Sequence, residues 1–155
     1  MGQREVSGAA PVVQVLRLPH HDGLPLPTRQ TAGAAGYDVS SADPDFVLAP
    51  MERRMVRTGL ALAIPPGYEC QVRPRSGLSI RQGVMLPNAP GTIDSDYRGE
   101  LVIGLINLGS APVPIARGTR IAQLIFQRVE AVELVETTEL PVTTRGAGGF
   151  GSTGA

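Results

Sequence analysis

The chain has 155 residues with a formal net charge of +0 at pH 7, and each of its 14 basic side chains is an arginine. Without lysine it can form neither a Schiff base nor a Walker-type phosphate loop, so arginine forks, backbone N–H groups and hydroxyls must hold any bound anion. The balanced charge leaves no footprint for stable nucleic-acid binding and no polybasic patch for a membrane surface.

The start of the chain, MGQREVSGAA, lacks the charged and apolar regions of a secretory signal peptide. No apolar run approaches the roughly 20 residues that span a bilayer. We therefore expect a cytoplasmic protein without membrane contact. The adjacent His20 and His21, next to Pro19, are expected in a solvated turn.

Short strand-like segments follow one another along the chain, because 19 glycines and 14 prolines interrupt any long helix. Runs rich in Val, Ile and Leu between turn residues predict strands. The predicted strands cover residues 12–18, 46–48, 55–57, 60–64, 68–73, 100–108, 113–115, 120–129 and 131–135. The last of these lies in the stretch 128–139, whose apolar residues also fit a helix loosely. One short helix is predicted over Ser76–Gln82, with Ser76 as N-cap and Gly83 as C-cap.

These elements predict an all-β fold, namely a sandwich, a jelly roll or a barrel. With 42% hydrophobic and 18% charged residues, the surface carries few charges, which favours an oligomer. Cys70 is the only cysteine. A single cysteine excludes an intramolecular disulfide and a multi-cysteine metal site, and leaves a buried thiol as the expectation.

Two segments in the first half of the chain carry polar groups suited to a phosphate ligand. In AGYD, Asp38 follows a run of small residues and can reach a metal-bound water. In PRSG, Arg75 and Ser76 stand where a strand turns into the predicted helix, so their groups and the helix N–H groups converge on one anion site. Taken singly, this second segment is more often a capped turn.

The segment GTIDSDYRGE, residues 91–100, has the pattern of a hairpin that carries two carboxylates. Ile93 and Tyr97 alternate around the acids, which is expected to turn Asp94 inward, whereas Asp96 is expected to be a structural turn acid. The alternative is a solvated hairpin tip.

Two later segments add an amide and a glycine-rich loop. Gln123 lies between apolar neighbours in a predicted strand, either as a satisfied core amide or as a ligand contact. The segment RGAGGFGSTG, residues 145–154, has glycines spaced as in a phosphate loop but Ser152 in place of the lysine. Composition alone predicts a flexible tail, although Arg145 is suited to pair with phosphate and Phe150 to stack on a base.

The order and identity of these five segments resemble the five motifs of the trimeric dUTP pyrophosphatase (dUTPase) family. The matching stretches read AGYDV (35–39), PRSGLS (74–79), NAPGTIDSDYRGE (88–100), GTRIAQLIF (118–126) and RGAGGFGSTG (145–154). The resemblance implies a homotrimer of β-clip or distorted jelly-roll barrels with one short helix. In each copy, residues 1–142 are expected to form the β domain and residues 143–155 a Gly-rich arm that closes over the active site.

The resemblance also implies hydrolysis of dUTP to dUMP and pyrophosphate by in-line attack of water on the α-phosphate, with Mg²⁺ as cofactor. Such an enzyme of nucleotide metabolism limits uracil incorporation into DNA and supplies dUMP for dTMP synthesis. An aspartate carboxylate is a weak base, so placing the water is expected to matter more than basicity.

The resemblance assigns a role to each candidate residue. Asp94 corresponds to the catalytic carboxylate, and Asp38 to the acid that contacts Mg²⁺ through water. Asn88 would read the uracil edge, and the ring of Tyr97 would occupy the place of a ribose 2′-hydroxyl. The implied substrate contacts are Arg75, Ser76, Gly77, Asn88, Thr92, Tyr97, Gln123, Arg145, Phe150, Gly151, Ser152 and Thr153. Three subunits would share each site: one gives the first, second and fourth segments, another the hairpin and a third the tail.

Two other functions compete with this one. A dCTP deaminase shares the fold and phosphate recognition but attacks the base, and Tyr97 together with the tail favours hydrolysis instead. A jelly-roll binding protein would need none of the five segments.

Overall fold

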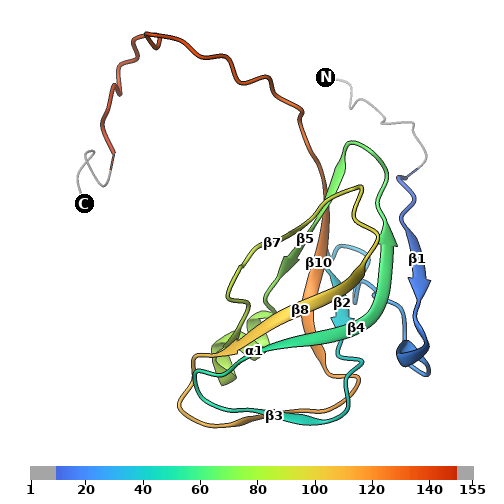
Figure 1. The fold of residues 1–155 in the computed structure, drawn as a ribbon. Helices are drawn as coiled ribbons and strands as arrows, with labels where there is room; N and C mark the ends of the chain where they lie inside the picture. Colours follow the sequence, from blue (N-terminus) through green and yellow to red (C-terminus); the bar gives the residue numbers. More distant parts are fainter. Residues whose placement is uncertain (1–9, 150–155) are drawn as a thin grey trace.

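The computed structural model describes residues 10–149, which fold mainly into strands (Figure 1). The strands are β1 (Gln14–Arg17), β2 (Tyr37–Ser40), β3 (Phe46–Leu48), β4 (Arg53–Ala63), β5 (Tyr68–Arg73), β6 (Val84–Met85), β7 (Gly91–Ile93), β8 (Glu100–Asn107), β9 (Val113–Ile115) and β10 (Arg120–Arg128). This part of the chain also holds the helix α1 (Ser76–Gln82) and the 3₁₀ turn η1 (Pro19–His21). The prediction of a mostly β fold with one short helix is confirmed. No helix within residues 10–149 combines the length and apolarity needed to cross a membrane.

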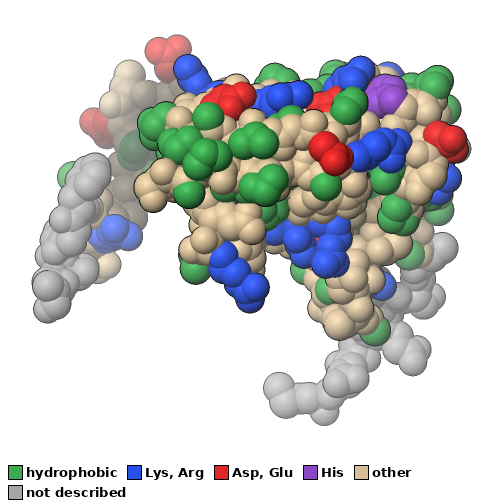
Figure 2. All heavy atoms as spheres, turned by 90° about the horizontal axis from the view of Figure 1, so that it is seen from below, with side chains coloured by type: hydrophobic (Ala, Val, Ile, Leu, Met, Phe, Trp, Pro, Cys, Tyr) green, Lys and Arg blue, Asp and Glu red, His purple; other side chains and the backbone are tan. Residues whose placement is uncertain are grey.

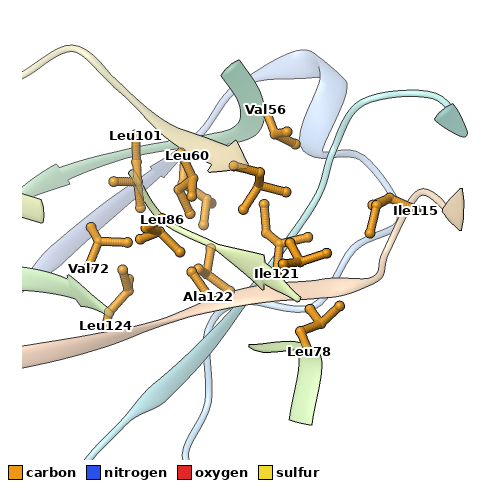
Figure 3. Close-up of a cluster of buried hydrophobic side chains, with 14 of the residues drawn as sticks. Val56, Leu60, Val72, Leu78, Leu86, Leu101, Ile115, Ile121, Ala122 and Leu124 are labelled. Carbon is orange, nitrogen blue, oxygen red and sulfur yellow. The ribbon is translucent and has the colours of Figure 1, made fainter. Parts of the chain in front are cut away.

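Two four-stranded antiparallel sheets supply the core. One has the strand order β1-β4-β8-β6 and the other β2-β10-β5-β7, while β3 and β9 form a separate pair. Leu60 from β4, Leu101 from β8 and Leu124 from β10 are each at most 2% exposed and meet in one cluster (Figure 3). Along β8 buried residues alternate with half-buried ones, as expected for a strand with one face on the core. Side chains from both sheets therefore build a single hydrophobic core.

Cys70 lies on β5 with no exposed surface. Burial raises the pKa of its thiol to about 12, with the neighbouring Glu69 carboxylate adding to the shift. The expected buried thiol is confirmed, and the group stays protonated and unreactive at neutral pH.

Several predicted elements have the predicted bounds, among them β3, β5, β9 and the helix α1. The two segments predicted at 55–57 and 60–64 belong to one strand, β4. Gly59 lies between them with φ +66°, a backbone conformation that glycine adopts without strain, so the strand runs through this position. The short strands β2, β6 and β7 were not predicted as strands. The helix has Gly83 as its C-cap, as predicted, but Arg75 occupies the N-cap position and Ser76 is the first helical residue.

The expected solvated turn for the two histidines is wrong. His21 is 1% exposed, and its Nδ1–H donates to the Thr58 carbonyl at 2.8 Å. A Cβ atom on Gly59 would lie 2.7 Å from the His21 Cβ, so the missing side chain lets the imidazole pack against β4. His20 places Nε2 2.7 Å from the Glu100 carboxylate, which also accepts the Gly59 N–H. The turn η1 is therefore fastened to the sheet rather than solvated.

After β10 the chain leaves the folded body as an extended segment, which we call the C-terminal arm (residues 130–149; Figure 1). The arm contains no strand or helix in the single chain, so both alternatives for residues 131–135, strand and helix, are wrong there. Its apolar side chains face solvent: Val132 is 74% exposed, Leu134 92% and Val142 99%. A segment this apolar lacks its packing partner in a single copy.

Candidate active site

Three of the candidate segments meet on one sheet, where β2, β10 and β5 are neighbours. Asp38 on β2 pairs with Gln123 on β10, and Gln123 pairs on its other side with Arg73 on β5. Residues paired in this way point to the same face of an antiparallel sheet. Arg75, two residues after the end of β5, donates from Nε to Asp38 in this row. The topology thus gathers the first, second and fourth segments at one place.

Asp38 is the electrostatic centre of this group. One carboxylate oxygen, Oδ1, lies 2.8 Å from Arg75 Nε, and the other, Oδ2, lies 3.4 Å from Arg75 Nη2 and 3.0 Å from Arg120 Nη1. The Asp38 side chain is only 13% exposed. A carboxylate this far from water is stabilised by the two guanidinium groups that compensate its charge.

Arg120 was not among the sequence-predicted site residues. It is three residues before Gln123, so regular alternation would turn the two side chains to opposite faces of β10. The pairing of β10 with β2 shifts register between Arg120 and Ala122. This bulge brings Arg120 to the Asp38 side of the sheet.

Gln123 packs tightly into the group and is half-buried. Its Nε2 donates to the Pro74 carbonyl at 2.9 Å. A Cβ atom on Gly36 would overlap Gln123 Oε1, so only glycine leaves room for the amide beside β2. The amide therefore joins the AGYD segment to the PRSG segment through its Nε2 group, and its role as a ligand contact stays a prediction.

Beside Asp38 a polar hollow of about 510 Å³ opens to solvent. Arg75, Arg81 and Arg120 all line it, together with Gly77 and Thr119, and no acidic residue of the described chain does. Figure 2 shows arginine side chains gathered on the face of the molecule seen from below. Three guanidinium groups around one opening suit a ligand with several negative charges. Ser76 is exposed at the first position of α1, next to Gly77.

The prediction of a hairpin for residues 91–100 is wrong, because β7 pairs with β5 in one sheet, β8 pairs with β4 and β6 in the other, and the two strands do not pair with each other. We keep the name hairpin for this connecting segment, residues 88–100. A turn closes it, with the Tyr97 N–H bonded to the Asp94 carbonyl at 3.2 Å, and the Tyr97 hydroxyl donates to the Glu100 carbonyl at 3.0 Å. Gly99 leaves space for the Tyr97 ring, which a Cβ atom there would overlap. The hairpin therefore has a defined shape in the single chain.

Asp94 is exposed in the single chain, so the expected inward orientation is wrong there. Neither Ile93 nor Tyr97 covers it, since Tyr97 is itself 46% exposed. Asn88 and Thr92 are also exposed, and the Asn88 amide lies over Gly91, 3.4 Å from the place of a Cβ atom. The face that carries these polar groups is open.

The hairpin and the Asp38 group lie at opposite ends of β5. Ile93 pairs with Cys70, so Asp94 lies beside the start of that strand, whereas Arg73 and Arg75 are at its end. At about 3.3 Å per residue the separation along the strand is on the order of 10 Å. Within one chain the Asp94 carboxylate does not face the arginine-lined hollow.

Arg145 is on the C-terminal arm, where its Nε donates to the Gly148 carbonyl at 2.8 Å. Within residues 130–149 every hydrogen bond joins two residues of the arm itself. The single chain therefore does not bring Arg145 to Asp38. The other candidate residues of the tail, Phe150, Gly151, Ser152 and Thr153, lie outside the described residues.

Comparison with known proteins gives consistent matches. A family model described as dUTPase matches residues 22–154. The deoxyuridine 5'-triphosphate nucleotidohydrolase of Methylocella silvestris is 58% identical over 146 residues, which cover 92% of this chain and 91% of that protein. A solved structure of a Staphylococcus bacteriophage 80alpha dUTPase mutant with dUpNHpp has a TM-score of 0.84 at 29% identity, covering 93% of this chain and 99% of that one. A mutant dUTPase of S. aureus phage phi11, solved to show how a structural Mg(II) ion is coordinated, has a TM-score of 0.76 at 26% identity, covering 84% and 99%.

Proposed function

Because the chain belongs to the dUTPase family and is therefore a hydrolase of dUTP, we propose that it releases dUMP and pyrophosphate by in-line attack of water on the α-phosphate. The observation that carries the proposal is the arginine-lined hollow beside Asp38, which offers several cationic groups to one polyanion. In this role the enzyme limits uracil incorporation into DNA and supplies dUMP for dTMP synthesis.

The Asp38 group forms the phosphate subsite. Arg75 and Ser76 contact the phosphate chain, Gly77 lets it approach the backbone at the start of α1, and Gln123 adds an amide contact. Arg75 and Gly77 line the hollow, Ser76 lies between them in the sequence, and Gln123 is bonded to the adjacent Pro74, which supports this assignment. Phosphoryl transfer depends mainly on positioning and on charge neutralisation, which such a set of donors provides.

The hairpin provides the base, the sugar and the water subsites. Asn88 and Thr92 face the nucleoside, and the Tyr97 ring stands where a ribose 2′-hydroxyl would need space. The fixed position of that ring, bonded through its hydroxyl to Glu100, supports selection by exclusion. Asp94 orients the attacking water and accepts its proton.

Mg²⁺ is proposed as the cofactor. Within residues 10–149 no three His, Cys, Asp or Glu side chains come together as a metal cage. Among the described residues, Asp38 is the one carboxylate of the group beside the hollow. A single carboxylate suits Mg²⁺, which keeps several waters and takes phosphate oxygens as ligands, so that Asp38 would contact the ion through water. The ion would neutralise phosphate charge, while Arg75 and Gln123 hold the chain of phosphates in place. The phage phi11 relative is described with a structural Mg(II) ion, so a related chain binds this metal.

The active protein is proposed to be a homotrimer with three shared active sites. The separation between Asp94 and Arg75 along β5 supports this proposal. The hairpin of one copy does not close the hollow of that copy, whereas the hairpin of a second copy can. The apolar C-terminal arm supports it as well, since Val132 and Leu134 find no cover on their own chain. Each subunit is proposed to be a β-clip or distorted jelly-roll barrel.

The tail closes the site in this proposal. Residues 143–155 form an arm from the third subunit, which places Arg145, Gly151, Ser152 and Thr153 on the γ-phosphate and Phe150 over the uracil ring. The chain leaves the body after β10 (Figure 1), and Arg145 bonds only within this segment, to Gly148, which supports a contact in trans.

A panel of nucleotides tests the reaction. We expect pyrophosphate release from dUTP in the presence of Mg²⁺ and at least about a hundredfold less from UTP, dTTP and dCTP. The hairpin excludes the 2′-hydroxyl of UTP and the methyl group of dTTP, and Asn88, which reads the uracil edge, does not match the amino group of cytosine. Pyrophosphate and ammonia are measured in the same samples. Ammonia from dCTP would assign the chain to the deaminase function, and equal rates with dUTP and UTP would contradict the role of Tyr97.

A further inference from the structure

Asp38 is shared by two arginines from different elements. Arg75 spans both of its carboxylate oxygens, at 2.8 Å and 3.4 Å, and Arg120 takes Oδ2 at 3.0 Å. The Arg75 side chain is 26% exposed and the Arg120 side chain 47%. The guanidinium that the proposed function assigns to the phosphate chain is thus already engaged with an acid of its own subunit.

Arg75 cannot serve both anions with the same N–H groups. A carboxylate bound to the fork of a guanidinium occupies the two N–H groups that a phosphate would otherwise bind. When the phosphate chain takes this edge of the guanidinium, it replaces Asp38 as the anionic partner of Arg75. Without a second cation, Asp38 would be left as a largely buried carboxylate next to an incoming polyanion, which costs free energy.

Arg120 is placed to prevent this. Its guanidinium holds Asp38 Oδ2, and its carbonyl accepts Arg75 Nη1 at 3.3 Å. One residue therefore contacts both members of the Asp38–Arg75 pair. Arg120 also lines the hollow in which Arg75 would meet the phosphates.

We propose that Arg120 is a positioning residue, which retains Asp38 and neutralises its charge when Arg75 turns from that carboxylate to the phosphate chain. The inference rests on the proposed roles of Arg75 and Asp38. Arg120 acts through these two residues.

A charge at this position has opposite effects on the two ligands. The Arg120 cation attracts the triphosphate and repels a divalent cation near Asp38. Removing it should weaken nucleotide binding and strengthen the apparent affinity for Mg²⁺. A residue that merely supports the fold would not move these two quantities in opposite directions.

The test compares Arg120→Gln and Arg120→Lys with the wild type, and uses Arg17→Gln as a control. Arg17 is an exposed arginine on β1 outside the Asp38 group, so that variant makes the same change of charge elsewhere. Steady-state kinetics give KM for dUTP, kcat and the half-saturating Mg²⁺ concentration. Calorimetry gives the Kd of the non-hydrolysable analogue dUpNHpp with Mg²⁺ and with chelator instead.

For Arg120→Gln we expect KM and the analogue Kd to rise about tenfold, kcat to fall by less than about threefold, and the half-saturating Mg²⁺ concentration to fall. Arg120→Lys keeps the charge, so its Mg²⁺ requirement should match the wild type while KM rises by about threefold. If Arg120→Gln does not assemble, the Mg²⁺ requirement and KM of Arg120→Lys decide whether Arg120 has the proposed positioning role. Arg17→Gln should behave as the wild type.

Two results would overturn the inference. One is an analogue Kd for Arg120→Gln within about twofold of the wild type. The other is a lower melting temperature, a lower kcat and a higher KM, together with an unchanged Mg²⁺ requirement. That combination is the behaviour of a structural residue. Neither result touches the proposed reaction. Conversely, a wild type inactive on dUTP would refute the reaction, while analogue binding would still decide the role of Arg120.

Discussion

Replacing Asp94 by asparagine is expected to lower kcat for dUTP by about a thousandfold, because the amide can neither accept the proton of the attacking water nor orient it in the same way. Asp94 is exposed on the hairpin in the single chain, so the change removes no core contact. Assembly and melting temperature should therefore equal those of the wild type. Pyrophosphate release, size-exclusion chromatography and thermal melting measure the three quantities.

The hairpin offers a matched control for this variant. Asp96→Asn makes the same chemical change two residues away, at another exposed position of the same turn. It should keep kcat within about threefold of the wild type, since Asp96 is assigned only to the turn. An active Asp94→Asn together with an inactive Asp96→Asn would exchange the roles of the two acids.

Ending the chain at Thr144 should lower turnover of dUTP by about a hundredfold or more, since the tail, residues 145–155, is proposed to supply Arg145 and the hydroxyls that contact the γ-phosphate. The truncated chain keeps Val132 and Leu134, the apolar part of the C-terminal arm that is exposed in a single copy. It should therefore still assemble. Turnover is read by pyrophosphate release and assembly by sedimentation.

A second variant separates the two parts of the arm. Leu134→Ser in the full-length chain should weaken assembly while leaving residues 145–155 intact, because it removes apolar surface that needs a partner. Full turnover by the truncated chain would show that the tail takes no part in the reaction.

The elements predicted best are those whose local sequence decides their structure. Strands β5 and β9 and helix α1 have clear turn or cap residues near both ends, and their bounds agree with the prediction. The stretch 131–135 has the apolar content of a strand but no strand beside it within its own chain. A strand needs a neighbouring strand, which the pattern of residues in this stretch does not identify.

Contacts distant in the sequence explain the remaining differences at the site. The burial of His21 depends on the missing side chain of Gly59, which no local pattern near the histidines indicates. Arg120 lies inside a segment that resembles the family, but its orientation depends on the β10 bulge. Asp38, Arg75 and Gln123 meet as the resemblance implies, whereas the roles of Asp94 and of the tail remain predictions.

The placement of Asp94 and Arg75 at opposite ends of β5 has a genetic consequence. If each site draws its hairpin and its tail from different copies, the two variants damage contributions of different subunits. Asp94→Asn damages the hairpin that one subunit gives to a site, and ending the chain at Thr144 removes the tail that another subunit gives to it. Two inactive alleles would then complement each other. In a three-fold ring every mixed trimer contains one complete site, so a random equal mixture should recover about a quarter of wild-type activity.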